Sequence, residues 1–489
     1  MSLPDPAPAQ RFTSAAFWST SAAAVSQIVR FGLFVALSRL VSPTEFGVVA
    51  LAAILVELLS SVSDGGMFDA AIQRRSLDDR EASTAFWLMT GIGVLLFGVA
   101  VLLSPLAAWV LRTPAVGPVV ALMALSLAVA PLGAVHLVRE TRRLAFRRLA
   151  MWSLASSIVG GLVGIGLALA GHGVLALAVR GLVTAAVMVA LAWIGAPWRP
   201  RLAFDQAAAS DLLRFGGSLL GSRIVAQVNA RGVELIAGLT IAPAAVGFLR
   251  VGGQCLNLLT QLTVAPLTQI AMPLLARARD DAAAYRDALV RVAGLSALVV
   301  YPVFFGAMAV SSVALPLVFG AHWAVAGSIM PILCVMAPAL HANLLISAVL
   351  VAKGRGRLMF YWSLAQAVVG LPLAAIGGVF GLYPLMILSV VKSYLLIPVG
   401  LAWIRRAADT EIAPLWRGAW RPLVMAVAMA AAVEGLKRAL PAGLAPAEAL
   451  ALLVGAGMIL FVAGMLAIDP ELRRQVGDGL RRVRARAAT

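Results

Sequence analysis

The sequence predicts an all-α, polytopic membrane protein with about 14 transmembrane helices. Of its 489 residues, 61% are hydrophobic and 12% are charged, whereas a soluble domain carries about 25% charged residues. The apolar residues fall into blocks of about 17 to 30, each long enough to cross the roughly 30 Å hydrocarbon layer as a helix. Positive charge is distributed unequally between the segments that join these blocks, as expected for a membrane protein.

Charged residues and Pro/Gly clusters separate the expected helices. The tenth helix is long enough to tilt, to kink at Pro331 or Pro338, or to include an interfacial segment. The fourteen helices are expected at about 14–37, 45–63, 84–109, 116–137, 150–170, 173–194, 215–239, 244–275, 292–313, 322–351, 360–379, 382–403, 422–436 and 448–467.

The first apolar block is expected to be a retained helix and not a cleaved signal sequence. Its leader contains one arginine, and its apolar stretch contains Gln27 and Arg30. The block ends in LSRLVSP, which is not a small-residue cleavage site.

The 39 lysines and arginines outnumber the 22 acidic residues, so the formal net charge is +17. If the N-terminus is inside, twenty-nine cations lie in inner segments and four in outer loops, namely Arg39, Arg112, Lys437 and Arg438. This asymmetry follows the positive-inside rule and predicts that both termini face the cytoplasm. Most of the surplus therefore orients the chain, and no nucleic-acid partner is expected. The basic tail from Leu472 is either a solvated segment or a contact for anionic lipid.

The sequence contains no catalytic, metal or cofactor motif. Cys255 and Cys334 both lie inside apolar blocks, so neither a disulfide framework nor a Cys-ligated metal site is expected. There is no Walker loop, HExxH or GxSxG motif. We therefore expect no enzyme activity, no cofactor and no direct use of ATP.

Two short matches suggest an internal repeat. Pro43 and Gly47 match Pro243 and Gly247 at an offset of 200, and a shorter match around Gly381 has an offset of 208 to the segment at Gly173. Parallel repeats of this kind occur in transporters whose substrate site lies between the halves. The predicted domains are an N-terminal six-helix lobe (1–200), a C-terminal six-helix lobe (210–405), two additional transmembrane helices (420–468) and a basic cytoplasmic tail (469–489).

Six cations remain inside the predicted spans. Each would cost roughly 2.5 to 3.5 kcal/mol at the bilayer centre, so we expect these side chains to face protein or water. The six are Arg30, Arg180, Arg223, Arg231, Arg250 and Lys392.

Helical phase places polar residues in one stripe on each of four helices, the first two of each half. A shared aqueous cavity between the halves would explain all four stripes. The stripes contain Thr20, Gln27 and Arg30; Glu57, Ser61 and Asp64; Arg223, Gln227, Arg231 and Glu234; and Arg250, Gln254, Asn257 and Gln261.

The excess of cations over carboxylates in this cavity predicts an anionic ligand. Guanidinium groups hold phosphate or pyrophosphate oxygens through paired hydrogen bonds. The alternative for Arg30, Arg180 and Arg250 is snorkelling, since each lies only about 9 to 10 Å from an outer helix end.

The carboxylates of the stripes also allow two interpretations. Glu57, Asp64 and Glu234 are either salt-bridge partners of the cations or groups that couple transport to protons or sodium.

Several segments of the chain resemble a known family of membrane exporters. The run from Ala36 to Leu88 is ALSRLVSPTEFGVVALAAILVELLSSVSDGGMFDAAIQRRSLDDREASTAFWL, and RRLAFRRLA, GHGVLALAVRGLV and LLRFGGSLLGSRIVAQVNARGVELIAGL follow it. These segments resemble the Wzx-like polysaccharide exporters, oligosaccharide flippases of the multidrug/oligosaccharidyl-lipid/polysaccharide exporter superfamily. The resemblance covers about residues 14–405, and its first segment is the most specific.

The resemblance implies two pseudo-symmetric six-helix bundles that form a V-shaped central cavity lined by the first, second, seventh and eighth helices. It implies alternating-access translocation of a polyprenyl-diphosphate-linked oligosaccharide across the bacterial inner membrane, for lipopolysaccharide O-antigen or exopolysaccharide biosynthesis. The expected partners are the lipid-linked oligosaccharide and membrane lipids. A polysaccharide polymerase and glycosyltransferases of the same pathway are candidate protein partners.

Other functions use a similar architecture. A peptidoglycan lipid-intermediate flippase shares the expected cavity charge, whereas a drug/cation antiporter would favour an acidic cavity. A membrane glycosyltransferase or polymerase should contain a large hydrophilic loop with catalytic acids or histidines, but the longest expected loops are about 20 residues. A scaffold without transport activity is the remaining alternative.

Overall fold

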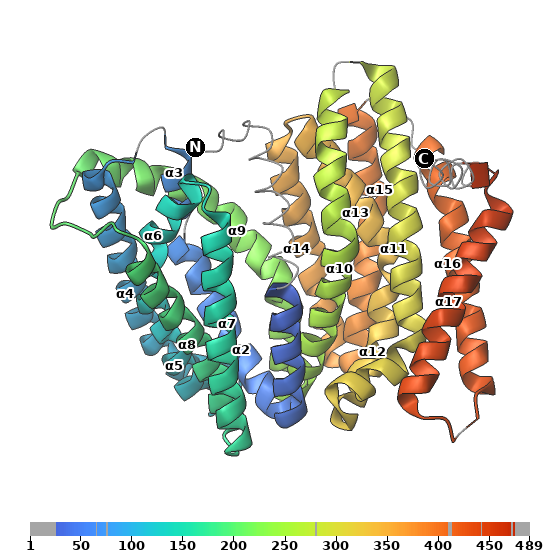
Figure 1. Cartoon of the computed structure of the whole chain (residues 1–489), viewed down its shortest axis with the longest axis horizontal. Helices are drawn as coiled ribbons and strands as arrows, with labels where there is room; N and C mark the ends of the chain where they lie inside the picture. Colours follow the sequence, from blue (N-terminus) through green and yellow to red (C-terminus); the bar gives the residue numbers. More distant parts are fainter. Residues whose placement is uncertain are drawn as a thin grey trace, which may run out of the picture. The chain divides into compact units, whose positions relative to one another are not determined.

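A computed structural model describes residues 26–64, 66–74, 77–278, 281–408, 413–441, 443–470 and 473–474. Thr20, the start of the first predicted span, most of the basic tail and the side chain of Asp64 lie outside the described residues. Within these ranges the chain forms α-helices, one 3-10 turn and no strand (Figure 1). The helices are residues 26–40, α2 (Pro43–Asp64), α3 (Met67–Gln73), α4 (Asp79–Val110), α5 (Val116–Val129), α6 (Pro131–Arg142), α7 (Phe146–Leu169), α8 (Gly173–Gly195), α9 (Gln206–Thr240), α10 (Pro243–Arg277), α11 (Ala282–Phe319), η1 (Ala321–Trp323), α12 (Ala324–Val335), α13 (Ala337–Ala352), α14 (Gly356–Val379), α15 (Leu382–Ala408), α16 (Ala413–Ala439) and α17 (Pro446–Ile468).

The all-α, multi-pass membrane fold is confirmed. Ten helices among the described residues are long and apolar enough to cross a membrane, or up to twelve if each of two bent helix pairs is one span. Residues 26–40 and α9, which carries Arg223, Arg231 and Glu234, are not among these ten. The count of fourteen spans therefore stays a prediction.

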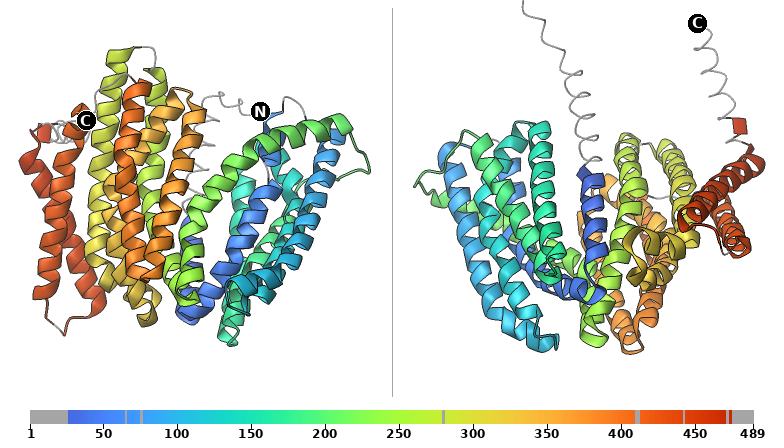
Figure 2. Two further views of the ribbon diagram at one scale, coloured as in Figure 1. Left: turned by 180° about the vertical axis from the view of Figure 1, so that it is seen from behind. Right: turned by 60° about the horizontal axis from the view of Figure 1, so that its bottom comes forward.

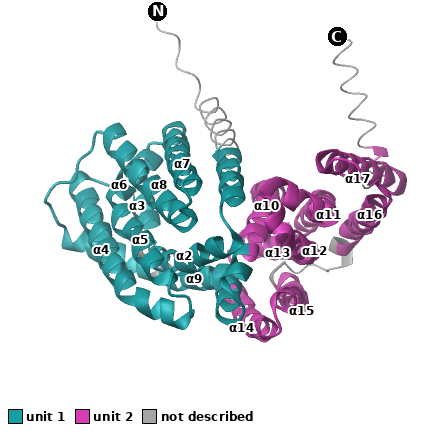
Figure 3. Ribbon diagram, turned by 90° about the horizontal axis from the view of Figure 1, so that it is seen from below, with its two compact units in different colours: residues 1–247 teal, residues 248–489 magenta. Residues whose placement is uncertain are grey.

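The chain divides into two compact units (Figure 3). Unit 1 comprises Met1–Gly247 and unit 2 comprises Phe248–Thr489. In unit 1, α9 packs against α2, α3 and α4, and Figure 2 shows it as a long, curved helix. In unit 2, α16 and α17 both pack against α11. The contacts thus group α9 with the first lobe, and the predicted lobe boundaries near residues 200–210 and 405 stay a prediction.

Two spans are broken by sharp bends. The axis changes by 44° between α5 and α6 and by 50° between the α12 and α13 segments. Pro131 is at the first helical position of α6, and Pro338 is in the first turn of α13, where a missing N–H costs no helical bond. For this segment the sequence leaves open a tilt, a kink at Pro331 or Pro338, or an interfacial segment. The break is at Met336, just before Pro338, whereas Pro331 lies inside α12.

Aspartates begin three of the long helices. Asp78, Asp205 and Asp281 each accept hydrogen bonds from backbone N–H groups in the first turn of α4, α9 and α11. Such N-caps satisfy donors that have no partner inside the helix. Hydrogen bonds from the N–H groups of Ala208 and Ala207 lower the pKa of Asp205. Its carboxylate therefore stays ionised at the start of α9 at neutral pH.

Helix boundaries recur along the chain, in keeping with the proposed repeat. Pro43 and Pro243 begin α2 and α10 at an offset of 200, and the caps Asp78 and Asp281 have an offset of 203. Both α7 and α14 have 24 residues and begin 210 positions apart. Each is followed by a glycine with positive φ, Gly171 or Gly381. The helix boundaries thus pair Gly381 with Gly171, whereas the sequence match pairs it with Gly173.

The matched Pro–Gly motifs lie against each other. A Cβ atom on Gly47 would lie 1.7 Å from the carbonyl oxygen of Pro243, and one on Gly247 would lie 2.1 Å from the carbonyl oxygen of Pro43. No larger residue fits without moving the backbone, since side-chain Cβ atoms do not approach within 3 Å. The repeated glycines therefore serve a reciprocal close contact between the first turns of α2 and α10.

We expect Gly47→Ala to destabilise the protein by about 1 to 3 kcal/mol, because the added methyl group overlaps a backbone carbonyl that cannot rotate away. Thermal unfolding of the purified protein in detergent measures this change. Gly91→Ala on α4 is the matched control, because nothing lies within 4 Å of its Cβ position. Equal melting temperatures for Gly47→Ala and the wild type would show that the contact does not exclude a larger side chain.

Candidate functional site

The polar stripe of α9 meets α2 within unit 1. The Nε atom of Arg231 donates to Oε2 of Glu57 at 2.6 Å, and its Nη1 atom donates to Oε1 of Glu234 at 3.2 Å. Gln227 donates from Nε2 to the same Glu57 oxygen at 3.1 Å. The side chains of Arg231 and Glu57 are 27% and 32% exposed. Four of the predicted site residues therefore form one cluster that is partly accessible.

A second arginine of the stripe pairs with a residue that sequence reasoning omits. Arg223 forms an ion pair with Asp69 of α3. The sequence interpretation places this segment in an inner loop, but it forms a short helix that begins after Gly66, whose φ is 75°. The available signal was the spacing of Met67, Ala70 and Ala71, which are buried on one face of that helix.

A third ion pair, between Arg74 and Asp211, joins the start of α9 to the end of α3. Arg74, directly after α3, lies 2.6 Å from Glu81 through Nη1 and 3.1 Å from Asp211 of α9 through Nη2. The guanidinium of Arg142 donates to three carbonyl groups at the C-terminal end of α3, at 2.6 to 3.2 Å. These contacts satisfy carbonyls that would otherwise lack partners and hold α3 in place.

Three ion pairs thus follow α9 along its length, through Asp211, Arg223 and Arg231. At 1.5 Å per residue, they are about 18 Å and 12 Å apart. Arg223 and Arg231 face three carboxylates, those of Asp69, Glu57 and Glu234, so this cluster by itself is not cationic. An anion that reaches these guanidinium groups has to displace a carboxylate.

Two further predicted cations lie elsewhere in unit 1. Arg30 is exposed, and its Nε atom donates to the carbonyl oxygen of Ser26 at 3.2 Å. Arg180 is half-buried on α8, and its stem packs against α7, where a Cβ on Gly164 would lie 3.1 Å from Arg180 Cβ. Within the described ranges, the Arg180 guanidinium has no ion pair or hydrogen bond. No ion pair joins either cation to the Arg231 cluster among the described residues.

Unit 2 contains the other predicted residues. Arg250, Gln254, Asn257 and Gln261 lie on α10, and the last two are exposed. Lys392 of α15 packs its stem against α14, where a Cβ on Gly370 would lie 3.3 Å from Lys392 Cδ. Its ammonium group has no ion pair or hydrogen bond in the described part of the chain. Arg180 and Lys392 thus share a setting: each lies on the last helix of its half, packed on a glycine of the preceding helix.

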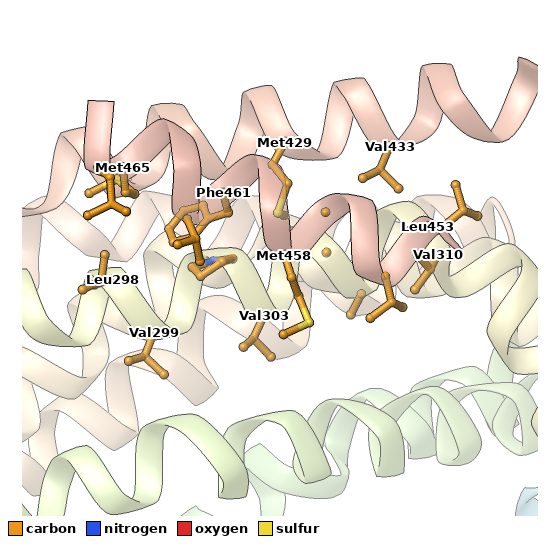
Figure 4. Close-up of a pocket in the computed structure, with 17 residues that line it drawn as sticks. Leu298, Val299, Val303, Val310, Met429, Val433, Leu453, Met458, Phe461 and Met465 are labelled. Carbon is orange, nitrogen blue, oxygen red and sulfur yellow. The ribbon is translucent and has the colours of Figure 1, made fainter. Parts of the chain in front are cut away.

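An apolar groove of about 650 Å³ lies between α11, α16 and α17 in unit 2 (Figure 4). The side chains that converge on it include Val303, Met429, Leu453, Met458 and Phe461, and every lining residue is apolar or glycine. The groove can therefore hold a hydrocarbon chain but offers no partner to a charged group. Across the described residues, no three His, Cys, Asp or Glu side chains gather as a metal site would require.

We expect the Arg231–Glu57 pair to give a measurable coupling energy. Glu57→Gln and Arg231→Gln should each lower thermal stability, because each leaves a partly buried charge with fewer partners. The double variant should be less destabilised than the sum of the two, with a coupling of about 1 to 2 kcal/mol. Melting curves of the four proteins measure this cycle, with Glu448→Gln on the exposed first turn of α17 as a control. Additive effects would show that the ion pair contributes nothing to stability.

Comparison with known sequences places the chain among proteins of polysaccharide biosynthesis. It is 26% identical over 460 residues to the succinoglycan biosynthesis transport protein ExoT of Rhizobium meliloti (strain 1021), which covers 92% of each chain. It is 26% identical to the lipopolysaccharide biosynthesis protein WzxC of Escherichia coli (strain K12), over 76% of this chain and 75% of WzxC. It is 27% identical to the teichuronic acid biosynthesis protein TuaB of Bacillus subtilis (strain 168), over 82% and 80%.

Solved structures share the fold. The chain is similar to the lipid II flippase MurJ in an inward closed conformation, with a TM-score of 0.74, 12% identity, and coverage of 93% of this chain and 99% of MurJ. It is also similar to an inward-facing multidrug resistance MATE transporter, with a TM-score of 0.59, 16% identity, and coverage of 78% and 98%. The family profile described as polysaccharide biosynthesis protein matches residues 36–328. The resemblance to Wzx-like exporters is thereby confirmed: the chain belongs to this family of polysaccharide biosynthesis proteins, and its fold is similar to those of MurJ and the MATE transporter.

Proposed function

We propose that the protein is a flippase of the bacterial inner membrane that translocates a polyprenyl-diphosphate-linked oligosaccharide for cell-surface polysaccharide biosynthesis. In this proposal the lobes alternate between inward-open and outward-open states, and both termini face the cytoplasm. The observation that carries the proposal is the pair of partly exposed guanidinium groups on α9, those of Arg223 and Arg231, in a chain of the polysaccharide biosynthesis family.

The chemistry of α9 suits a diphosphate. A guanidinium group binds two phosphate oxygens at once, and this pairing strengthens where water is scarce. Arg223 and Arg231 are held by carboxylates, so an arriving diphosphate can replace one set of oxygens with another. Arg30, Arg180, Arg250 and Lys392 would supply further positive charge, while Gln254, Asn257 and Gln261 would donate hydrogen bonds to sugar hydroxyls. The polyprenyl chain would stay in lipid, and the apolar groove of unit 2 matches its chemistry.

The alternatives are less well supported. A drug/cation antiporter needs carboxylates that are open to a cation, but Glu57 and Glu234 are both engaged by Arg231. Similarity to MurJ concerns the fold and does not favour peptidoglycan intermediates as the substrate. The relatives are named for succinoglycan, lipopolysaccharide and teichuronic acid, which differ in sugars. We therefore propose a transporter without enzyme activity whose substrates share the lipid diphosphate, with pathway polymerases and glycosyltransferases as partners.

Neutralising two stripe arginines together should slow transport strongly. In vesicles that contain polyprenyl-diphosphate oligosaccharide, we expect Arg231→Gln/Arg250→Gln to slow translocation by roughly a hundredfold, since each lost charge-assisted hydrogen bond costs about 1.5 kcal/mol or more. Arg231→Lys retains the charge but loses the two-pronged geometry, so its translocation rate should lie between those of the wild type and the double variant. Arg357→Gln, at the exposed start of α14, is the control. Wild-type translocation by the double variant would contradict the phosphate-binding role.

A separate experiment addresses the carboxylates. Because Glu57 and Glu234 lie in ion pairs, we propose that they hold Arg231 until a phosphate displaces them. Glu57→Gln should then tighten binding of polyprenyl diphosphate severalfold, because a competing anion is gone, and should leave any dependence of translocation on proton or sodium gradients unchanged. Loss of that dependence in Glu57→Gln or Glu234→Gln would assign them to ion coupling instead. Asp64→Asn tests the remaining carboxylate in the same way.

A further inference from the structure

A polar cavity of about 550 Å³ lies in unit 1 between α3 and the beginning of α9, apart from the Arg231–Glu57 cluster. Its polar lining comes from Gln73 and Arg74 at the end of α3 and from Asp211 and Arg214 of α9. Leu212, which is only 2% exposed, and Phe215 add apolar surface. The cavity therefore combines guanidinium groups with an apolar wall.

The two arginines of this cavity differ in their engagement. Arg74 is bound by Glu81 and Asp211. Arg214 is exposed, and within the described ranges it forms neither an ion pair nor a hydrogen bond. Arg74 is therefore balanced by two carboxylates, whereas the guanidinium of Arg214 has all its donors available to a ligand.

The position of the cavity along α9 indicates what it meets. The 35 residues of α9 measure about 52 Å, which exceeds the roughly 30 Å of the hydrocarbon layer. The charged residues Asp211 and Arg214 precede the predicted seventh span, which begins at Phe215. In the predicted topology this end of α9 is cytoplasmic, so the cavity would lie at the level of the lipid head groups of the cytoplasmic leaflet.

We propose that this cavity binds the phosphate-bearing head group of a lipid in the cytoplasmic leaflet. Arg214 contacts the phosphate oxygens beside Arg74, and Phe215 contacts the first carbons of the lipid. Two sources share this chemistry. One is an anionic phospholipid of the bilayer. The other is a polyprenyl diphosphate before it reaches the α9 ion pairs, and this source rests on the proposed function.

Photo-crosslinking tests the proposal without measuring transport. A benzoylphenylalanine residue replaces Phe215 in the full chain, which is reconstituted into vesicles of a phosphate-free glycosyl diacylglycerol. One set also contains phosphatidylglycerol, and another contains undecaprenyl diphosphate. Mass spectrometry of the crosslinked peptide identifies the lipid. Arg214→Gln should reduce labelling by the phosphate-bearing lipid about tenfold, the effect of one charge-assisted hydrogen bond. Arg357→Gln is the matched control.

A second variant changes labelling in the opposite direction. Asp211→Asn removes the carboxylate that lies 3.1 Å from Arg74 Nη2, so labelling should rise severalfold. Labelling of phosphatidylglycerol identifies a phospholipid site, and preferential labelling of undecaprenyl diphosphate identifies a site that receives the substrate. Labelling of the glycolipid alone, or labelling that Arg214→Gln leaves unchanged, would overturn the proposal. Because no flipping is measured, these outcomes are independent of the transport experiments above.

Discussion

The three ion pairs that join α9 to α2 and α3 organise unit 1. They connect residues 137, 154 and 174 positions apart, so each closes a long loop of chain. A charge in a poorly hydrated interior must find a partner, because the desolvation cost of an isolated ion is several kcal/mol. By its place in the repeat α9 begins the second half, but these pairs and its packing place it in the first unit.

The same ion pairs connect the fold to the proposed function. Carboxylates pair with Arg223 and Arg231 in the structure, and a diphosphate would offer the same guanidinium groups more oxygens and more charge. The apolar groove and the cavity beside Arg214 have different chemistry, hydrocarbon in one and a charged rim with an apolar wall in the other. A lipid-linked sugar phosphate combines in one molecule a hydrocarbon chain and charged phosphates, which complement these surfaces.

The repeat appears in the structure as equivalent helix caps, bends and glycines in the two halves. Asp78 and Asp281 cap the third helices of the halves, a proline follows the bend in each fourth span, and glycines of positive φ end each fifth helix. The offset grows from 200 to 210 along the chain, which explains why matching letters at one fixed offset finds only fragments. The reciprocal contact of Gly47 and Gly247 shows that the Pro–Gly motifs matched at offset 200 lie where two backbones approach closely.

The amino-acid sequence was enough to predict the all-α membrane fold and the polar stripes, since hydrophobic blocks, positive charge and helical phase are local properties. It placed Arg231, Gln227 and Glu234 on one face of a helix, and Glu57 in the stripe of another. Only the tertiary structure decided which charges meet: that Asp69 lies against Arg223, and that the stripe of α9 is balanced by carboxylates. Helical periodicity predicts the face of its own helix on which a side chain lies. Which charged residue of a neighbouring helix it meets depends on how the helices pack. That packing is set by close contacts and by the need of each buried charge for a counter-ion.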